Sequence, residues 1–237
     1  MVKSGRLLSL GLAAVVAAPA HATLVTLSGS SVDFIIDDTQ PGLALYGLPT
    51  VAGDSLLFFP SQFRAQSNNG AGTLGVNATI NFEVRSHNAA AVDLSSVMVS
   101  EFGDYFVTPA SGGSVSAVAQ LGAVNLMAAN PPVTFRQDIE QTGTLTQGGA
   151  NDWSLVTNID FRQVWLTPTD RAQLTLQNDL SATSVLNPSE AWIEKKFQGL
   201  IVQVQVVPLP AALPLLLTGL AGFAALARRR IAKPAFV

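Results

Sequence analysis

The chain has 237 residues, 48% of them hydrophobic, and carries 13 basic and 16 acidic side chains for a net charge of −3. Six of the basic residues lie in the two termini, so the stretch between them holds 7 basic against 16 acidic residues, a balance of −9. Such an acidic region is repelled by phosphate backbones, which argues against nucleic acid as a partner. The absence of cysteine excludes disulfides and an N-terminal lipid-modified cysteine.

The first 22 residues have the layout of a secretory signal peptide. Lys3 and Arg6 form a positive region, and an apolar run follows over residues 7–18. Ala20 and Ala22 then place small residues at the two positions that signal peptidase reads. The apolar run is short for a membrane span, which needs about 20 residues. We therefore predict export with cleavage after Ala22, and an uncleaved N-terminal anchor is the alternative.

Residues 23–206 are predicted to form one extracytoplasmic β-rich domain. Apolar and polar residues alternate in several runs, as expected for strands with one buried and one solvated face. The apolar sets are Ile80, Phe82 and Val84; Trp153, Leu155, Ile159 and Phe161; Ala172, Leu174 and Leu176; and Val202, Val204 and Val206. Turn-forming clusters separate them at residues 39–42, 68–70, 111–113, 147–149 and 187–189. The pattern predicts an all-β fold, an antiparallel β-sandwich resembling a jelly roll.

One helix is predicted inside this domain, from Pro188 to Phe197. Asn187 provides its N-cap, and Glu190 places a negative charge in the first turn, where the helix dipole favours it.

Catalytic and metal-binding patterns are sparse in the middle of the chain. His87 is the only histidine after the predicted cleavage, and we interpret it as a turn residue beside Asn88. Without cysteine, the usual zinc ligand sets cannot be assembled. No Gly-x-Ser-x-Gly elbow surrounds a serine. Residues 70–75 have the Gly-x-Gly-x-x-Gly spacing, but their strand-like neighbours do not fit a dinucleotide-binding loop that opens a helix. The sequence predicts no catalytic residue, no metal site and no cofactor.

Acidic pairs leave two binding or catalytic alternatives open. A glycoside hydrolase needs only two facing carboxylates, and the candidates are Asp37 with Asp38, Glu101 with Asp104, and Asp138 with Glu140. Turn chemistry or a solvated strand face explains each pair equally well. Oxygen-rich loops also leave calcium binding open, although no EF-hand loop is present.

The three tryptophans are interpreted as core residues rather than as sugar-stacking platforms. Trp153 shares the parity of the apolar residues around it, which favours the core. Trp165 and Trp192 are less decided, and a carbohydrate-binding module would expose one of them in a groove.

Residues 207–237 form a separate C-terminal segment. Residues 211–227 carry no charge and would form a helix about 25 Å long, close to the thickness of a membrane core. The arginines at 228–230 then favour a cytoplasmic end. Pro208 and Pro210 are expected to keep the preceding stretch extended, outside both the helix and the β-domain.

This segment resembles the PEP-CTERM sorting signal in its VPLPA variant. The resemblance rests on Val207, Pro208, Leu209, Pro210 and Ala211, followed by the apolar helix and the arginine cluster. It implies recognition by exosortase, an integral-membrane cysteine transpeptidase of Gram-negative bacteria that also produce extracellular polysaccharide. By the same resemblance, residues 208–210 are the cleavage element, and Arg228, Arg229 and Arg230 are the stop-transfer anchor. Leu209 replaces the usual glutamate, which favours a variant enzyme.

Together these features predict an exported, non-enzymatic bacterial surface or extracellular-matrix protein, associated with exopolysaccharide or biofilm. Its precursor would be membrane-anchored, and secretion machinery and exosortase would be its partners during export. The alternatives are a secreted carbohydrate- or calcium-binding module, a two-carboxylate glycoside hydrolase, and a permanently anchored protein whose tail is not processed.

Overall fold

Alternation of buried and exposed side chains shapes most of the described chain into long strands. The computed structural model describes residues 23–87, 92–127, 134–139, 145–165 and 169–208. The elements are β1 (Leu24–Ser28), β2 (Val32–Asp37), α1 (Leu43–Tyr46), β3 (Thr50–Ala52), β4 (Ser55–Phe58), β5 (Arg64–Asn68), β6 (Gly72–Ser86), β7 (Val92–Val107), β8 (Ser114–Asn125), β9 (Thr134–Ile139), β10 (Gly149–Asp160), α2 (Phe161–Val164), β11 (Arg171–Ser184) and β12 (Glu190–Pro208).

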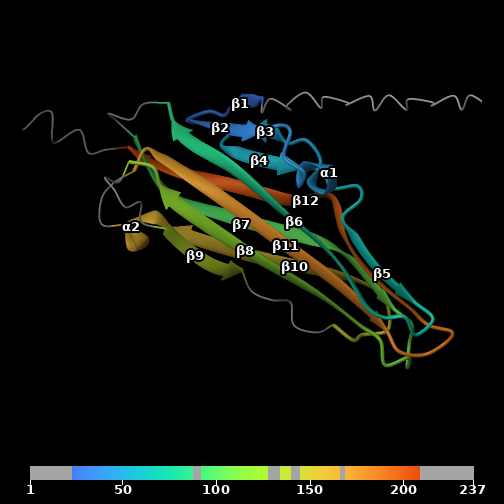
Figure 1. Cartoon of the computed structure of the whole chain (residues 1–237). Coiled ribbons are helices and arrows are strands. Elements are labelled where there is room, and N and C mark those ends of the chain that lie inside the picture. Colours follow the sequence, from blue (N-terminus) through green and yellow to red (C-terminus); the bar gives the residue numbers. More distant parts are fainter. Residues whose placement is uncertain (1–22, 88–91, 128–133, 140–144, 166–168, 209–237) are drawn as a thin grey trace, which may run out of the picture.

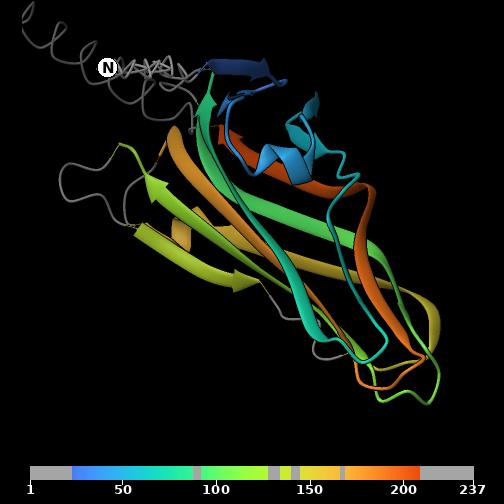
Figure 2. The same ribbon diagram turned by 45° about the vertical axis from the view of Figure 1, so that its right-hand side comes forward.

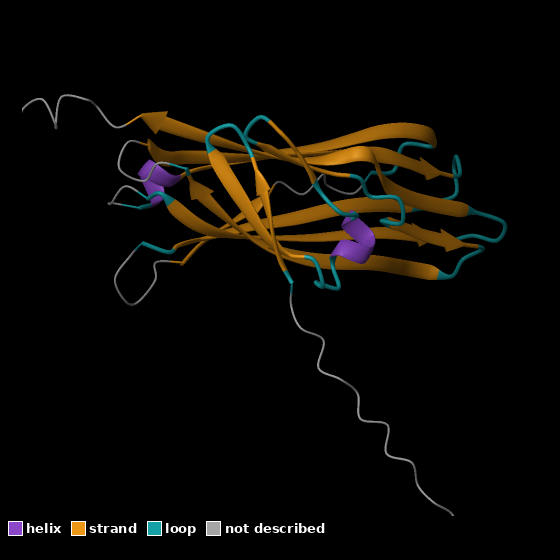
Figure 3. Cartoon of the chain, turned by 90° about the horizontal axis from the view of Figure 1, so that it is seen from above, coloured by secondary structure: helices purple, strands orange, loops and turns teal. Residues whose placement is uncertain are grey.

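The strands form two six-stranded sheets that pack as two layers (Figures 1 and 3). Sheet A has the order β1-β2-β6-β11-β8-β9. Sheet B has the order β10-β7-β12-β4-β3, and β5 also pairs with β12. Neighbouring strands pair antiparallel in the described parts of both sheets. The predicted all-β antiparallel sandwich is confirmed. Figure 2 shows how far the long strands run along it.

The core lies between the inner faces of the two sheets. Each predicted apolar set points inward, and its members are buried except Val206, which is partly buried against the core. Removing each large side chain of this kind from water contributes about 1.5–3 kcal/mol. The predicted turns also hold: residues 39–42 lead into α1, and the other clusters separate consecutive strands. At the β5–β6 turn, Asn69 and Gly70 both adopt positive φ, which explains these residue types there.

The predicted helix over Pro188–Phe197 is wrong, because β12 begins at Glu190. Ala191, Ile193 and Lys195 are buried while Trp192 is half-buried, a period of two rather than 3.6. β5 pairs with this stretch on one side and β7 on the other, so neighbouring strands satisfy its backbone groups. Asn187 and Pro188 lie instead in the turn between β11 and β12. Turns favour asparagine and proline just as helix starts do, so the local pattern fits both structures.

A large irregular bulge interrupts β12 after Lys195. Lys195 lies opposite Gly103 of β7 and Leu200 opposite Glu101, so residues 196–199 face a single residue of β7. The other partner of β12 changes here from β5 to β4. Gly199 sits where an added Cβ would lie 2.4 Å from the Lys196 carbonyl oxygen, which requires a glycine. The bulge thus lets one strand serve two partners along its length.

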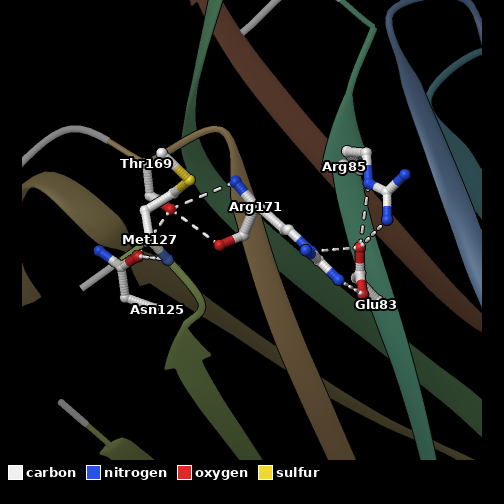
Figure 4. A network of polar contacts seen from close by, with 6 residues as sticks. All are labelled: Glu83, Arg85, Asn125, Met127, Thr169 and Arg171. Atoms are coloured by element: carbon white, nitrogen blue, oxygen red, sulfur yellow. Dashed lines mark hydrogen bonds and ion pairs between the residues drawn. The ribbon is translucent and has the colours of Figure 1, made fainter. Parts of the chain in front are cut away.

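A network of polar side chains ties strands of sheet A together at one end (Figure 4). Arg171 donates two hydrogen bonds to the Glu83 carboxylate, at 2.6 and 2.8 Å, and Arg85 donates to the same group. Burial opposes ionisation of Glu83, but the two arginines outweigh it and lower the pKa of the carboxyl. Nearby, Thr169 donates to the buried Asn125 side chain at 2.9 Å. These contacts link β6, β11 and the end of β8.

The helices in the described ranges, α1 and α2, are four residues each. No helix within those ranges is long and apolar enough to cross a membrane. The predicted signal peptide and the predicted membrane helix at residues 211–227 lie outside the described residues.

Candidate functional site

Trp192 stands half-buried on the outer face of sheet B, near the start of β12. It lies opposite Phe106 of β7, and the two rings stack with centroids 6.3 Å apart. The Arg64 guanidinium of β5 lies 4.4 Å from the centroid of the Trp192 ring. Glu194 holds Arg64 in place through an ion pair of 3.0 Å. The result is an aromatic group on the surface with a cation beside it.

Two carboxylates lie beside this aromatic group. Asp104 of β7 and Asp152 of β10 are cross-strand partners, so their side chains share the outer face. Lys196 Nζ bridges them, 2.8 Å from Asp104 Oδ1 and 3.0 Å from Asp152 Oδ1. The hydrogen bonds that Lys196 donates to Asp104 and Asp152 raise the pKa of Lys196, and its hydrogen bond to Asp152 lowers the pKa of that carboxyl. Sequence reasoning missed this acidic pair, because only the β7–β10 register brings it together.

Together these side chains border a shallow hollow of about 380 Å³, lined by Asp104, Ala150, Asn151, Asp152 and Trp192. An indole ring with carboxylates and an amide nearby is the mixture of apolar surface and hydrogen-bonding groups that holds a polyhydroxylated ligand. Because Arg64 already lies over the Trp192 ring, such a ligand would have to displace it or contact the ring edge.

The other two tryptophans are core residues, as predicted. Trp153 and Trp165 are each 4% exposed, and Trp165 stacks on Phe161 with ring centroids 4.6 Å apart. Trp192 is the one that departs from that interpretation.

The structure does not bring the predicted carboxylate pairs together as facing acids where it describes them. Asp37 accepts two hydrogen bonds from Thr39, at 2.6 and 2.9 Å, which is turn chemistry. Glu101 points into the core and Asp104 to the outer face, as expected for residues three apart on a strand. The side chain of Asp138 and all of Glu140 lie outside the described residues.

His87 lies in a bend directly after β6, in agreement with its interpretation as a turn residue. Its Nε2 atom is 2.9 Å from Asp33 Oδ1, and its backbone N–H donates to the Ser31 carbonyl. Among the described residues, no three histidine, aspartate or glutamate side chains are grouped so that they could hold a metal ion.

The predicted sorting motif begins inside the folded domain. Val207 and Pro208 are the last residues of β12 and pair with Asp93 and Val92 of β7. This corrects the expectation that the prolines keep the whole motif out of the β-domain. A proline is tolerated at a strand end, where it interrupts little of the hydrogen-bond ladder. The rest of the motif from Leu209, the arginines at 228–230, and Ala20 and Ala22 lie outside the described residues.

No protein-family model matches this chain, and no curated protein matches its sequence. A structure of infectious bursal disease virus, Gt strain, is 16% identical with a TM-score of 0.28, covering 70% of this chain and 43% of the viral chain. A carbohydrate-binding module of the β-sandwich superfamily is 8% identical with a TM-score of 0.19, covering 74% and 96%. A module solved for specific mannan recognition is 11% identical with a TM-score of 0.20, covering 77% and 98%. The chain thus spans less than half of the viral chain it matches. Likenesses this weak carry no argument about what the chain binds.

Proposed function

We propose that this protein is an exported, non-enzymatic surface or extracellular-matrix protein of a Gram-negative bacterium. In this proposal its C-terminal segment is a sorting signal with the motif at residues 207–211, which exosortase recognises and cleaves in the region 208–210, after which the β-sandwich joins exopolysaccharide or biofilm. Before cleavage the precursor is held in the inner membrane by residues 211–227.

One observation supports this proposal beyond the sequence resemblance. β12 ends at Pro208, so the last strand of the sandwich holds the first two residues of the motif and leads directly into the rest of it from Leu209. A protease that reads an extended peptide would then cut beside the folded domain and leave β12 in place. The Trp192 site lies near the opposite end of β12. Its neighbour Phe106 is 14 residues from Val92 on β7, or up to about 45 Å. A chain anchored at Pro208 would therefore carry that site at the far end of these strands from the anchor.

The mass of the mature protein tests the proposal. The full chain, recovered from a host that contains the exosortase, should begin at Thr23 and end between Val207 and Ala211, with any transferred group as added mass. A Pro208→Ala/Pro210→Ala variant should keep its tail and stay in the membrane fraction. A wild-type chain that still ends at Val237 in that host would mean a permanently anchored protein.

A second candidate, a carbohydrate-binding module, is favoured by Trp192 alone. It is the tryptophan that stays partly exposed, and it lines a hollow with two carboxylates and an amide. Calorimetry with exopolysaccharide from the host should then give a binding heat that Trp192→Ala abolishes. Val156→Ala, an exposed apolar change elsewhere on β10, is the matched control. Equal heats for wild type and Trp192→Ala would rule out this site.

A further inference from the structure

Three polar side chains meet in the apolar core between the two sheets. Glu101 comes from β7 and Lys195 from β12, both in sheet B, and Asn178 comes from β11 in sheet A. Each is at most 4% exposed. The Lys195 ammonium contacts Glu101 Oε2, and the Asn178 amide Nδ2 donates to Glu101 Oε1 at 2.9 Å. One carboxylate therefore holds an amine and a carboxamide side by side, one on each oxygen.

Aromatic rings enclose this group. Lys195 Nζ lies 5.3 Å from the ring centroid of Phe63 and 5.3 Å from that of Trp153. Burial lowers the pKa of Lys195, although Glu101 opposes the change. Burial also raises the pKa of Tyr46 well above its usual value. The charge of Glu101 raises this pKa further, and the side chain of Asn178 lowers it. The lysine is thus placed in a dry site that favours its neutral, nucleophilic form.

We propose that Lys195 and Asn178 form an intramolecular isopeptide bond, with Glu101 as the catalytic acid–base residue. This cross-link would join sheet A to sheet B through the middle of the core. It goes beyond the proposed function and does not depend on the sorting signal.

The reaction balances with the three side chains alone. Glu101 takes a proton from the Lys195 ammonium, and the free amine attacks Cγ of Asn178. The bond from Nζ to Cγ forms and the bond from Cγ to Nδ2 breaks. A proton that the attacking nitrogen gives up passes through Glu101 to Nδ2, which leaves as ammonia. Glu101 ends as a neutral carboxylic acid beside a neutral amide, and no oxidant, metal or cofactor is needed.

Two features of the site favour this product over a plain ion pair. A buried ion pair carries a large desolvation cost, and amide formation removes both charges from the core. In addition, within the described part of the chain, Asn178 Oδ1 is buried without a hydrogen-bond partner. In the product this oxygen becomes the carbonyl of the new amide, and the protonated Glu101 can donate to it. The chain has no cysteine, so disulfides cannot supply such a cross-link.

Digestion of the folded wild-type protein tests the bond directly. The digest combines trypsin with a protease that cleaves after glutamate. Residues 172–190 should then be recovered joined to the dipeptide 195–196, lighter than the sum of the two by one ammonia. Trypsin should fail to cut after the acylated Lys195. Deamidation of Asn178 through a cyclic imide also loses ammonia, but it would leave residues 172–190 without the dipeptide.

Two variants complete the test. Lys196→Arg changes the neighbouring surface lysine and should leave the cross-link intact. Glu101→Gln keeps both reacting side chains and should give unlinked peptides. The wild-type digest decides the question even if Glu101→Gln does not fold. Complete cleavage after Lys195, with residues 172–190 at unmodified mass in protein that circular dichroism shows to be folded, would overturn the proposal.

Discussion

Lys195 and Lys196 are neighbours on β12, yet they point to opposite faces of sheet B and experience opposite environments. The side chain of Lys195 is 0% exposed and that of Lys196 is 42% exposed. Burial lowers the pKa of Lys195, whereas hydrogen bonds to Asp104 and Asp152 raise that of Lys196. The same ionic group is therefore destabilised by lost hydration on one face and stabilised by pairing on the other.

Their carboxylate partners repeat the contrast on β7. Glu101 is buried with Lys195, while Asp104 shares the surface with Lys196 and Asp152. A buried charge that loses its partner keeps its desolvation cost, whereas an exposed charge that loses its partner stays hydrated. The comparison predicts that identical substitutions at adjacent positions will have very different consequences.

The largest difference is expected between Lys195→Met and Lys196→Met. In protein without the cross-link, Lys195→Met leaves the Glu101 carboxylate buried without its cation and should lower the free energy of unfolding by about 3–5 kcal/mol. Where the proposed cross-link forms, the substitution would also remove it. Lys196→Met should have little effect, because water replaces the ammonium at Asp104 and Asp152. Urea unfolding of both variants at pH 7 measures the difference, and equal shifts in their midpoints would contradict it.

Gly103 provides a second test, because its lack of a side chain leaves space for Trp153 next to the buried Lys195. It pairs with Lys195 on one neighbouring strand and with Trp153 on the other. An added Cβ would lie 1.9 Å from the Glu194 carbonyl oxygen and 2.5 Å from Trp153 Nε1. Gly103→Ala should therefore cost about 3 kcal/mol of stability, since backbone and indole must both move.

The matched control for that substitution is Gly75→Ala, also in a long strand. There the nearest atom to an added Cβ is the Leu180 carbonyl oxygen at 3.4 Å, an ordinary contact. Thermal unfolding should show a large drop in Tm for Gly103→Ala and a small change for Gly75→Ala. Similar drops for both would mean that the core around Trp153 rearranges at little cost to accommodate the added methyl group.

Much of the buried face could be read from the sequence, but its polar group could not. Alternation along β6, β10 and β11 placed the apolar residues correctly, because a strand buries every second residue. The same alternation through Ala191, Ile193 and Lys195 would have placed a lysine inside the core. This alternation was overlooked because residues 188–197 were predicted to be a helix from a capping pattern. Such a pattern depends only on neighbouring residues, whereas the strand depends on pairing with other strands.

The residues that meet at the surface site are set by the register between strands, which a local sequence pattern does not reveal. The spacing of Glu101 and Asp104 was interpreted as a candidate pair, yet strand geometry puts residues three apart on opposite faces. The carboxylates that do meet, Asp104 and Asp152, are cross-strand partners from distant parts of the chain. Their contact follows from the pairing of β7 with β10, a tertiary fact that a single sequence does not specify.

Glu83 is intermediate between the buried Glu101 and the exposed Asp104, and its substitution should have a smaller consequence than those above. Its side chain is 16% exposed, and it accepts two hydrogen bonds from Arg171 (Figure 4). Because its pKa in the folded protein lies below the ordinary value of 4.5, its stabilising contribution is fully present above about pH 4.5. It is lost as the pH falls through the lowered pKa. Glu83→Gln should cost about 1 kcal/mol at pH 7, and the difference from wild type should shrink toward pH 3.

The pH dependence of urea unfolding separates the two parts of that effect. Arg171→Lys keeps the positive charge but loses the paired geometry, so its cost should be smaller than that of Glu83→Gln and should vanish over the same pH range. A difference between Glu83→Gln and wild type that stays constant from pH 7 to pH 3 would mean that Glu83 acts through packing. In that case a carboxylate on this sheet would behave like neither Glu101 in the core nor Asp104 on the surface.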